Sequence, residues 1–313
     1  MASSSLATWD TVIGANILPL HADGSIDWDS LERHLHALMD SGIETIFVNA
    51  VTGEGPLMTP SEREQVLRLA VSSLGESASI GACLHPSSTQ EAIETATAMR
   101  EQGASAILVF PHPEFAGRRG DSAAAVRYFE AISGASELPL VVYQATMESG
   151  MQFSPSVLQD IAAVDGVAAI KEGSWNLSAY HTTVEMFAGE ASRTAVLADG
   201  DTLLTAMLRL GADGIMSGGT AVVASRLVQS VYNSPDFGRS KGDEGRLKQL
   251  TAALYQTPFG DFRSRVKTIL ATRGEIKTAT VRAPLPAISA AEARSLIELT
   301  RSLNLDNGQT HGR

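Results

Sequence analysis

The fold is decided by a short sequence that occurs three times, as SGIETI at residues 41–46, QGASAI at residues 102–107 and LGADGI at residues 210–215. Each copy has a glycine, which can adopt the left-handed backbone conformation that ends a helix, followed at once by an apolar run. Short connections from a helix to a buried strand are typical of parallel α/β proteins. The repeated sequence therefore predicts helix-to-strand joints.

Outward from these joints, short apolar runs alternate with longer segments of helical period. The helix starts agree with this alternation, because Thr59, Pro60 and Glu62 supply an N-cap, a proline at the first helical position and the glutamate of a capping box. Eight apolar runs are found, at residues 11–18, 44–48, 79–82, 105–110, 140–143, 167–170, 195–198 and 214–216. We therefore predict a (β/α)8 barrel.

The chain continues well beyond the eighth run, with helical patterns at about residues 241–255, 262–273 and 290–303. This is more material than the barrel needs. We expect residues 1–225 to form the barrel and residues 226–305 to form a C-terminal helical extension packed on it. Residues 306–313 are polar and contain glycine, so we expect a disordered tail.

Composition excludes several classes of protein. The hydrophobic content of 44% favours a globular protein, and no apolar run is long enough to span a membrane. The formal net charge of −11 argues against a nucleic-acid partner, because phosphate contacts require clustered Lys and Arg. A single cysteine, Cys83, cannot form an internal disulfide, and residues 1–10 lack the features of a signal peptide. We expect a cytoplasmic protein.

In a barrel of this kind, catalytic residues stand at the carboxyl ends of the strands. We predict neither a cofactor nor a dedicated metal site, because the chain has no cysteine cluster and its seven histidines show no HExxH spacing. The polar residues expected at the strand ends are Thr52, His85, His112, Tyr143, Lys171, Asp199, Asp201 and Ser217.

Lys171 directly follows an apolar run, so its amine is expected to point into the barrel mouth, where little water is present. Desolvation disfavours the ammonium form, lowers the pKa of the lysine and exposes a nucleophile. The alternative is a lysine that reaches solvent or pairs with Glu172. Tyr143 ends the preceding strand, and its phenol would either transfer protons beside Lys171 or serve as a core tyrosine. The pairing of the two residues favours catalysis.

The segment VTGEG at residues 51–55 follows the second apolar run. Its glycines let backbone N–H groups approach an anion, and Thr52 adds a hydroxyl. A carboxylate would suit this turn. The alternative is an ordinary glycine turn that leads to the helix capped by Thr59.

Taken together, these motifs resemble the dihydrodipicolinate synthase and N-acetylneuraminate lyase family of class I, Schiff-base aldolases. The resemblance is carried by VTGE at residues 51–54, VY at 142–143 with SG at 149–150, and IKEGS at 170–174, and it spans roughly residues 10–300. It implies that Lys171 forms the Schiff base and that Tyr143 transfers protons. Thr52, with the neighbouring backbone at Val51 and Gly53, would hold the carboxylate of a 2-oxo acid. It also implies a homo-oligomer, either a dimer or a tetramer.

Three departures argue against the best-known activity of this family. Val51 stands where dihydrodipicolinate synthases have the first of two hydroxyl residues. Glu148 stands where they have an arginine for the aldehyde's carboxylate, and a buried carboxylate there would repel that substrate. The tyrosine that a neighbouring subunit contributes has no match at residues 110–115, where His112 either replaces part of the proton relay or lies in a surface loop.

Two further residues are candidates for substrate binding. Asp201 lies where some lyases of the family bind the hydroxyls of a sugar-like substrate, although capping of the helix that starts at Thr202 explains it equally well. Ser217 follows the eighth run and would face the same mouth.

We therefore expect a Schiff-base lyase, either an aldolase or a dehydratase, that acts on pyruvate or a pyruvate-derived 2-oxo acid. Dihydrodipicolinate synthase is one alternative. Another is a metal-dependent barrel aldolase whose ligands would come from His85, His112, Asp199 and Asp201. A third is a sensor that binds a 2-oxo acid without turnover.

Overall fold

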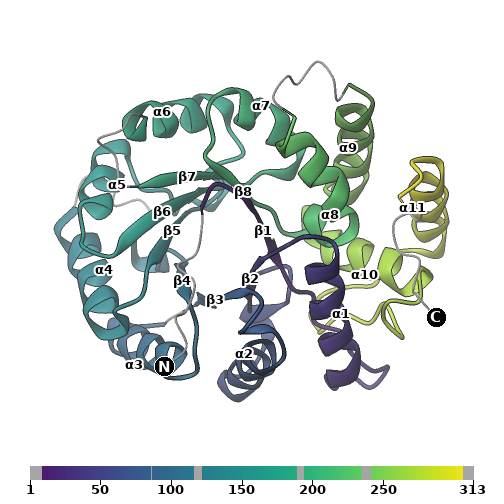
Figure 1. Cartoon of the computed structure of the whole chain (residues 1–313), viewed down its shortest axis with the longest axis horizontal. Helices are drawn as coiled ribbons and strands as arrows, with labels where there is room; N and C mark the ends of the chain where they lie inside the picture. The colour runs from purple at the N-terminus through teal and green to yellow at the C-terminus, as the bar shows by residue number, and fades with distance from the viewer. Residues whose placement is uncertain (1–8, 86, 116–121, 189–193, 235–240, 306–313) are drawn as a thin grey trace.

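The computed structural model describes residues 9–305, apart from residues 86, 116–121, 189–193 and 235–240. Eight parallel strands form a closed barrel in the order β1 to β8, and helices surround it (Figure 1). The strands are β1 (Val12–Ala15), β2 (Thr45–Val48), β3 (Ser79–Leu84), β4 (Ala106–Val109), β5 (Leu140–Gln144), β6 (Val167–Glu172), β7 (Ala195–Ala198) and β8 (Gly214–Met216). The predicted (β/α)8 barrel is confirmed.

The helices that follow the strands return the chain to the start of the next strand. Within the barrel they are α1 (Trp28–Asp40), α2 (Pro60–Leu74), α3 (Thr89–Glu101), α4 (Ser122–Ser136), α5 (Pro155–Ala162), α6 (Leu177–Phe187), α7 (Leu204–Arg209) and α8 (Gly219–Tyr232). After them come α9 (Lys241–Leu254), α10 (Phe262–Thr272) and α11 (Ala290–Ser302).

The predicted joints adopt the expected geometry. Gly42, Gly103 and Gly211 have φ angles of +91°, +90° and +101°. Each glycine donates its N–H to a carbonyl in the last turn of the preceding helix. At the start of α2, Thr59 and Glu62 form the capping box that the sequence predicts.

Several strand ends differ from the expectation. β1 stops at Ala15, three residues early, because the N–H of Ile17 leaves the sheet and is bonded to the buried ring of His34. In the opposite sense, β5 and β6 continue past the expected ends, so that Tyr143 and Lys171 pair within the ladder. The two residues are therefore fixed side by side by strand register.

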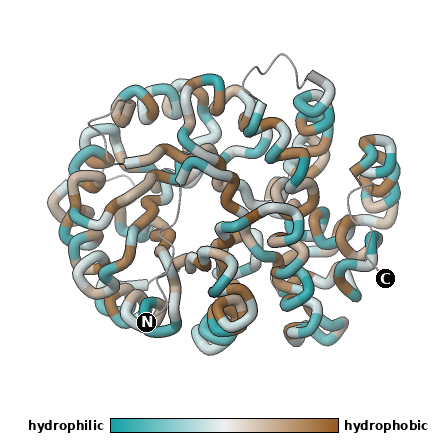
Figure 2. Tube along the Cα trace, in the orientation of Figure 1, coloured by the Kyte–Doolittle hydropathy of each residue, from teal (hydrophilic) through white to brown (hydrophobic). Residues whose placement is uncertain are grey.

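Alternating side chains on the strands supply two apolar layers. Phe47, Leu108 and Met216 point into the barrel, whereas neighbours such as Ile46 and Ile107 pack outward against the helices. This alternation is the period of two expected for strands whose two faces are both buried. Figure 2 shows the resulting brown segments along the strands, with mixed hydropathy on the surrounding helices.

The C-terminal extension packs on one side of the barrel. Helix α10 contacts α8, α9 and α11, and α11 is the outermost of these (Figure 1). The expected domain boundary at residue 225 falls inside α8, next to the kink at Ala224. Lys267 of α10 is fully buried and pairs with the equally buried Glu54 after β2. This ion pair joins the extension to the loop that carries Thr52.

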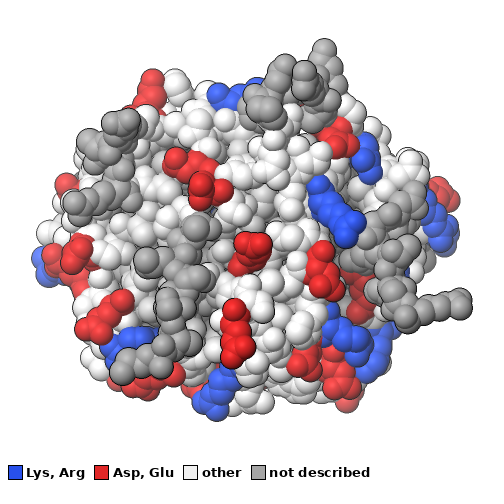
Figure 3. Space-filling model, viewed as in Figure 1, with Lys and Arg blue, Asp and Glu red and all other residues white. Residues whose placement is uncertain are grey.

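The expected tail, residues 306–313, lies outside the described residues. Within the part of the chain that the structure describes, no helix has the length and apolar character needed to cross a membrane. Charged side chains of both signs are interspersed among the described residues on the face in Figure 3.

Candidate active site

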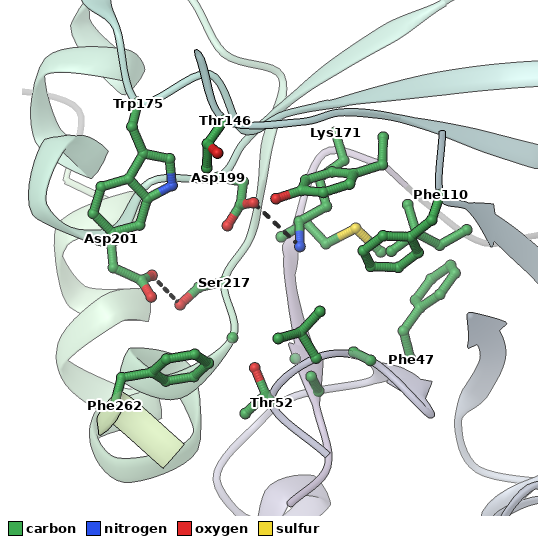
Figure 4. Close-up of a pocket in the computed structure, with 18 of the residues that line it drawn as sticks. Phe47, Thr52, Phe110, Thr146, Lys171, Trp175, Asp199, Asp201, Ser217 and Phe262 are labelled. Carbon is green, nitrogen blue, oxygen red and sulfur yellow. Dashed lines mark hydrogen bonds and ion pairs between the residues drawn. The ribbon is translucent and has the colours of Figure 1, made fainter. Parts of the chain in front are cut away.

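A cavity opens at the carboxyl ends of the strands and encloses roughly 700 Å³, including its opening to solvent (Figure 4). Side chains from β1, β2, β4, β5, β6, the segments after β7 and β8, and the C-terminal extension line it. The lining residues are Gly14, Ala15, Phe47, Ala50, Val51, Thr52, Leu108, Phe110, Tyr143, Thr146, Lys171, Trp175, Asp199, Asp201, Met216, Ser217, Gly218, Tyr255, Phe259 and Phe262.

Three proton-carrying side chains meet in this cavity. The Nζ atom of Lys171 lies 3.3 Å from Oδ2 of Asp199 and 5.0 Å from the centre of the Tyr143 ring (Figure 4). The Tyr143 phenol and the Asp199 carboxylate are close enough for each to change the pKa of the other. The Lys171 and Asp199 side chains are only 13% and 12% exposed. The amine, the carboxylate and the phenol therefore form one connected group that is largely shielded from water.

Burial raises the pKa of both acidic side chains of this group, Asp199 and Tyr143. It raises the pKa of Asp199, although the neighbouring Lys171 ammonium opposes the rise. The pKa of Tyr143 is raised well above its ordinary value, first by burial and then by the nearby Asp199 carboxylate. Tyr143 is consequently a neutral phenol at neutral pH, and Asp199 is a stronger base than an exposed aspartate.

Gly173 allows this cluster to form. A Cβ atom at this position would lie 2.6 Å from Cε2 of Tyr143 and 2.8 Å from Oδ2 of Asp199, both closer than real contacts permit. The preceding residue, Glu172, points to the opposite face of β6, where Ser174 and Thr183 donate hydrogen bonds to it. Lys171 therefore faces Asp199 inside the cavity and does not pair with Glu172.

The turn after β2 forms another part of the cavity. Thr52 is buried, and its hydroxyl lies so close to Gly218 that a Cβ atom there would be 2.3 Å from it. Gly218 is the N-cap of α8, so the start of this helix and the Thr52 hydroxyl face the same space. Val51 and Thr52 line the cavity, whereas Gly53 packs behind them against Asn16. The arrangement offers hydrogen-bond donors to an anion.

Asp201 lies on the other side of the cavity, where both of its carboxylate oxygens accept hydrogen bonds. Ser217 donates to Oδ1 of Asp201, and Tyr255 donates to Oδ2 (Figure 4 draws the first of these). Burial and the nearby Asp199 raise the pKa of Asp201 to about 6. Both predicted residues, Asp201 and Ser217, therefore line the cavity, but their polar atoms are already engaged with each other.

Two of the predicted residues lie elsewhere. Glu148 is exposed, in a short turn after β5 that is held by the Ser149 hydroxyl on the Thr146 carbonyl, so its expected burial is wrong. His112 is half-buried, and its ring is bonded to the carbonyl of Ser87. Neither residue is part of the cavity lining.

Histidines contribute little to the described cavity. Burial lowers the pKa of His85 to about 4, and its ring is bonded to the Asn49 carbonyl while it packs on Phe110. In the portions of the chain that the structure describes, no group of three or more His, Cys, Asp or Glu residues is placed to hold a metal ion.

Sequence reasoning missed the aromatic residues of the cavity. We use the term aromatic wall for Trp175, Tyr255, Phe259 and Phe262, whose neighbouring ring centres are 5.1 to 5.7 Å apart. Trp175 follows Lys171 by four positions, so it could have been predicted as a residue at the barrel mouth. The other three come from the C-terminal extension, and no local pattern connects them to the barrel mouth.

Known proteins resemble this chain over most of its length. The sequence pattern of the dihydrodipicolinate synthetase family matches residues 8–302. An uncharacterized DapA-like lyase of Halobacterium salinarum is 28% identical over 88% of this chain and 87% of its own length. A 4-hydroxy-tetrahydrodipicolinate synthase of Methanothrix thermoacetophila is 28% identical over 78% of this chain and 81% of its own length.

Solved structures share the same architecture. YagE, a prophage protein of Escherichia coli K12 whose structure is a complex with pyruvate, aligns with a TM-score of 0.85 at 21% identity, covering 96% of this chain and 100% of YagE. Dihydrodipicolinate synthase from Aquifex aeolicus aligns with a TM-score of 0.82 at 25% identity, covering 94% of this chain and 98% of the enzyme.

Proposed function

Since this chain belongs to the dihydrodipicolinate synthetase family, it is a class I lyase, and we propose that it acts on pyruvate or a pyruvate-derived 2-oxo acid through a Schiff base on Lys171. The observation that carries the proposal is the contact of the Lys171 amine with Asp199, beside the Tyr143 ring. The pyruvate complex of YagE supports a 2-oxo acid as the substrate.

Imine formation begins with loss of a proton from the Lys171 ammonium to the Asp199 carboxylate, 3.3 Å away. The neutral amine then attacks C2 of the 2-oxo acid and forms a carbinolamine. The proton held by Asp199 passes through the Tyr143 hydroxyl to the carbinolamine hydroxyl, which leaves as water. Asp199 is then a carboxylate again, facing the cationic imine that it stabilises.

The imine serves as the electron sink for the second half of the reaction. In retro-aldol cleavage, the C4 hydroxyl gives its proton to Tyr143, which passes its own phenol proton to the Asp199 carboxylate, and the C3–C4 bond breaks. Its electron pair moves to C3, which gives an enamine on Lys171 and a free aldehyde. Synthesis follows the same path in reverse, and dehydration would begin with loss of a C3 proton instead.

The substrate carboxylate is proposed to lie between the Thr52 hydroxyl and the N-terminus of α8. Thr52 is buried against Gly218, so its hydroxyl is fixed and no side chain of residue 218 fills the space. Helix N-termini and serine or threonine hydroxyls are good donors to carboxylates. Val51 contributes a wall to this end of the cavity and Gly53 the backbone of the turn.

The alternatives find less support. A synthase acting on an aldehyde with its own carboxylate needs a cation beside the imine, and Lys171 is the only Lys or Arg in the described cavity lining. A metal-dependent aldolase would use His85 and His112, but these rings are engaged with the carbonyls of Asn49 and Ser87. A non-catalytic sensor would not require an amine, a carboxylate and a phenol close together.

The test is incubation with pyruvate and borohydride, followed by intact-mass measurement and peptide mapping. We expect a reduced pyruvate adduct on Lys171. The absence of an adduct with pyruvate and with longer 2-oxo acids would overturn the proposal. We also propose a cytoplasmic homo-oligomer, a dimer or a tetramer, which light scattering of the purified chain would test.

A further inference from the structure

We propose that the aldehyde half of the substrate carries an uncharged aromatic ring, which lies against the aromatic wall while the 2-oxo acid is held on Lys171. This inference rests on the proposed function and deepens it. In the cleavage direction the substrate would be a 4-aryl-4-hydroxy-2-oxo acid, and in the synthetic direction an aromatic aldehyde would react with the enamine of pyruvate.

The first argument is the shape and composition of the aromatic wall. Trp175 packs edge-on against Tyr255 and Phe259, with ring centres 5.3 and 5.1 Å apart. Phe259 lines the cavity and is nevertheless 46% exposed, so one part of its ring lacks a partner. Figure 4 shows Trp175 and Phe262 on the side of the cavity that holds Asp201, with Thr52 lying between Phe262 and Phe47. A flat ring fills such a space with favourable stacking geometry.

The backbone at Trp175 supports a functional role for its side chain. Trp175 has a φ angle of +55°, which bulky residues rarely adopt. Such conformations cost free energy and tend to occur where a side chain must be held in a particular place. Here the unusual backbone places the indole in the cavity lining, four residues after Lys171.

The second argument is charge. Among the described lining residues the acidic groups are Asp199 and Asp201, and the only cation is Lys171, which already faces Asp199. An aldehyde with a carboxylate or phosphate would therefore bring a negative charge toward two buried carboxyl groups with no basic residue to receive it. Such a contact is unfavourable at low dielectric.

The third argument concerns hydroxyl groups. A carboxylate such as Asp201 would be expected to bind the hydroxyls of a polyhydroxylated substrate, but Ser217 and Tyr255 already donate to its two oxygens. A sugar-like fragment would have to break these bonds in a buried place, which costs free energy unless it replaces both. The cavity beyond Lys171 therefore favours an apolar ring over a charged or polyhydroxylated chain.

The reaction in the synthetic direction balances without a further reactant. C3 of the enamine attacks the aldehyde carbon, and the new C–C bond takes the enamine electron pair. The aldehyde oxygen takes a proton from Tyr143, and Asp199 resupplies Tyr143 with the proton that C3 of the imine lost to it when the enamine formed. A cationic imine is thereby formed again on Lys171. Water then hydrolyses the imine, releasing the 4-hydroxy-2-oxo acid and the lysine amine.

The experiment compares three aldehydes of similar size with pyruvate as the common donor. Benzaldehyde represents the aromatic class, glyceraldehyde the polyhydroxylated class and succinic semialdehyde the anionic class. We expect kcat/KM for benzaldehyde to exceed the other two by about ten-fold or more, with 4-hydroxy-2-oxo-4-phenylbutanoate as the product detected by liquid chromatography. A preference for either of the other aldehydes would overturn the inference.

The borohydride adduct separates this inference from the proposed function. If pyruvate is trapped on Lys171 but benzaldehyde is a poorer acceptor than glyceraldehyde or succinic semialdehyde, the Schiff-base proposal stands and the aromatic inference fails. If no adduct forms with any 2-oxo acid, both fail together.

Variants of the aromatic wall localise the effect. Because Phe259 is half exposed, Phe259→Leu should fold normally and should raise KM for benzaldehyde by about two- to ten-fold. Trp175→Leu should do the same. The matched control is Leu177→Ala, an exposed apolar residue outside the cavity lining, which should leave both KM for benzaldehyde and the rate of pyruvate trapping unchanged. Equal effects of Phe259→Leu and Leu177→Ala would contradict the inference.

Discussion

The side of the cavity that carries Lys171 and the side formed by the aromatic wall are built by the chain in different ways. Tyr143 and Lys171 are paired in adjacent strands, and Asp199 follows the next strand, β7. The aromatic wall instead combines Trp175 from a loop with residues from a helical extension that lies after the barrel. Strand register fixes the first side, whereas long-range packing of the extension fixes the second.

This difference suggests a division of labour. Groups held by a closed sheet keep their mutual distances when loops change, which suits proton transfer. Residues on an extension and its connecting turns can vary without disturbing the sheet, which suits selection of the second substrate. In our proposal the strand side performs the chemistry and the aromatic wall selects the aldehyde.

The largest effect is expected when the strand side loses its nucleophile. Lys171→Ala should abolish the borohydride adduct and lower turnover by at least about 10³-fold, because no other lysine or arginine lines the described cavity. Intact mass and a turnover assay measure the two quantities, and a thermal melt checks the fold. A trapped adduct in this variant would show that another amine reacts.

The next largest effect is expected where the extension meets the barrel. Lys267→Met leaves the fully buried Glu54 carboxylate without its ion-pair partner. Breaking a buried pair in this way typically costs about 3 to 5 kcal/mol of the free energy of unfolding. Urea denaturation of the variant would measure it.

A surface pair provides the control for that measurement. Arg68 and Glu64 form an ion pair whose side chains are 62% and 47% exposed. Arg68→Met should therefore change the free energy of unfolding by less than about 1 kcal/mol. If the two variants are equally stable, the buried pair does not hold the extension to the barrel as we infer.

A smaller effect is expected when the base of the strand side is removed but its shape is kept. Asp199→Asn should slow imine formation by about 10²-fold, because the amide keeps the shape of the carboxylate but cannot accept a proton from Lys171. The pH dependence sharpens the test. Burial raises the pKa of Asp199, so activity in the parent enzyme should fall as pH decreases through that pKa and the carboxylate is protonated.

The variant should lack this acidic limb, since asparagine does not titrate. Measuring the rate of pyruvate trapping as a function of pH gives both the rate of imine formation and its acidic limb. An unchanged rate and an unchanged acidic limb would mean that Asp199 takes no part in the proton transfer.

The same contrast explains what the sequence could predict. The joints at Gly42, Gly103 and Gly211 are local patterns, so they identified the barrel. The positions of Tyr143 and Lys171 followed from their places at the ends of neighbouring strands. The fold and the strand side of the cavity are thus encoded in short stretches of the chain.

The remainder depends on contacts that no local pattern reveals. The approach of Asp199 to Lys171 requires the missing side chain of Gly173, and the aromatic wall requires residues more than 80 positions beyond Lys171 to fold back over the mouth. Glu148 was expected to be buried because it stands where the family has an arginine that binds the aldehyde's carboxylate. A short turn instead directs it to solvent. Loop conformation, unlike strand register, cannot be derived from spacing.

The smallest effect is expected at Asp201, where the two sides of the cavity meet through Tyr255. Its pKa is raised from an ordinary value of 3.8 to about 6, mainly by burial, so the folded state binds a proton more tightly than the unfolded state. The stabilisation from that proton is complete below pH 3.8 and is lost as pH rises through 6. Between pH 5 and pH 8 the loss should be about 1.5 kcal/mol. Asp201→Asn, which does not titrate, should therefore weaken the dependence of the free energy of unfolding on pH by that amount. Urea denaturation of both proteins at pH 5 and pH 8 measures the difference, and parallel pH profiles would mean that Asp201 titrates as it does in the unfolded chain.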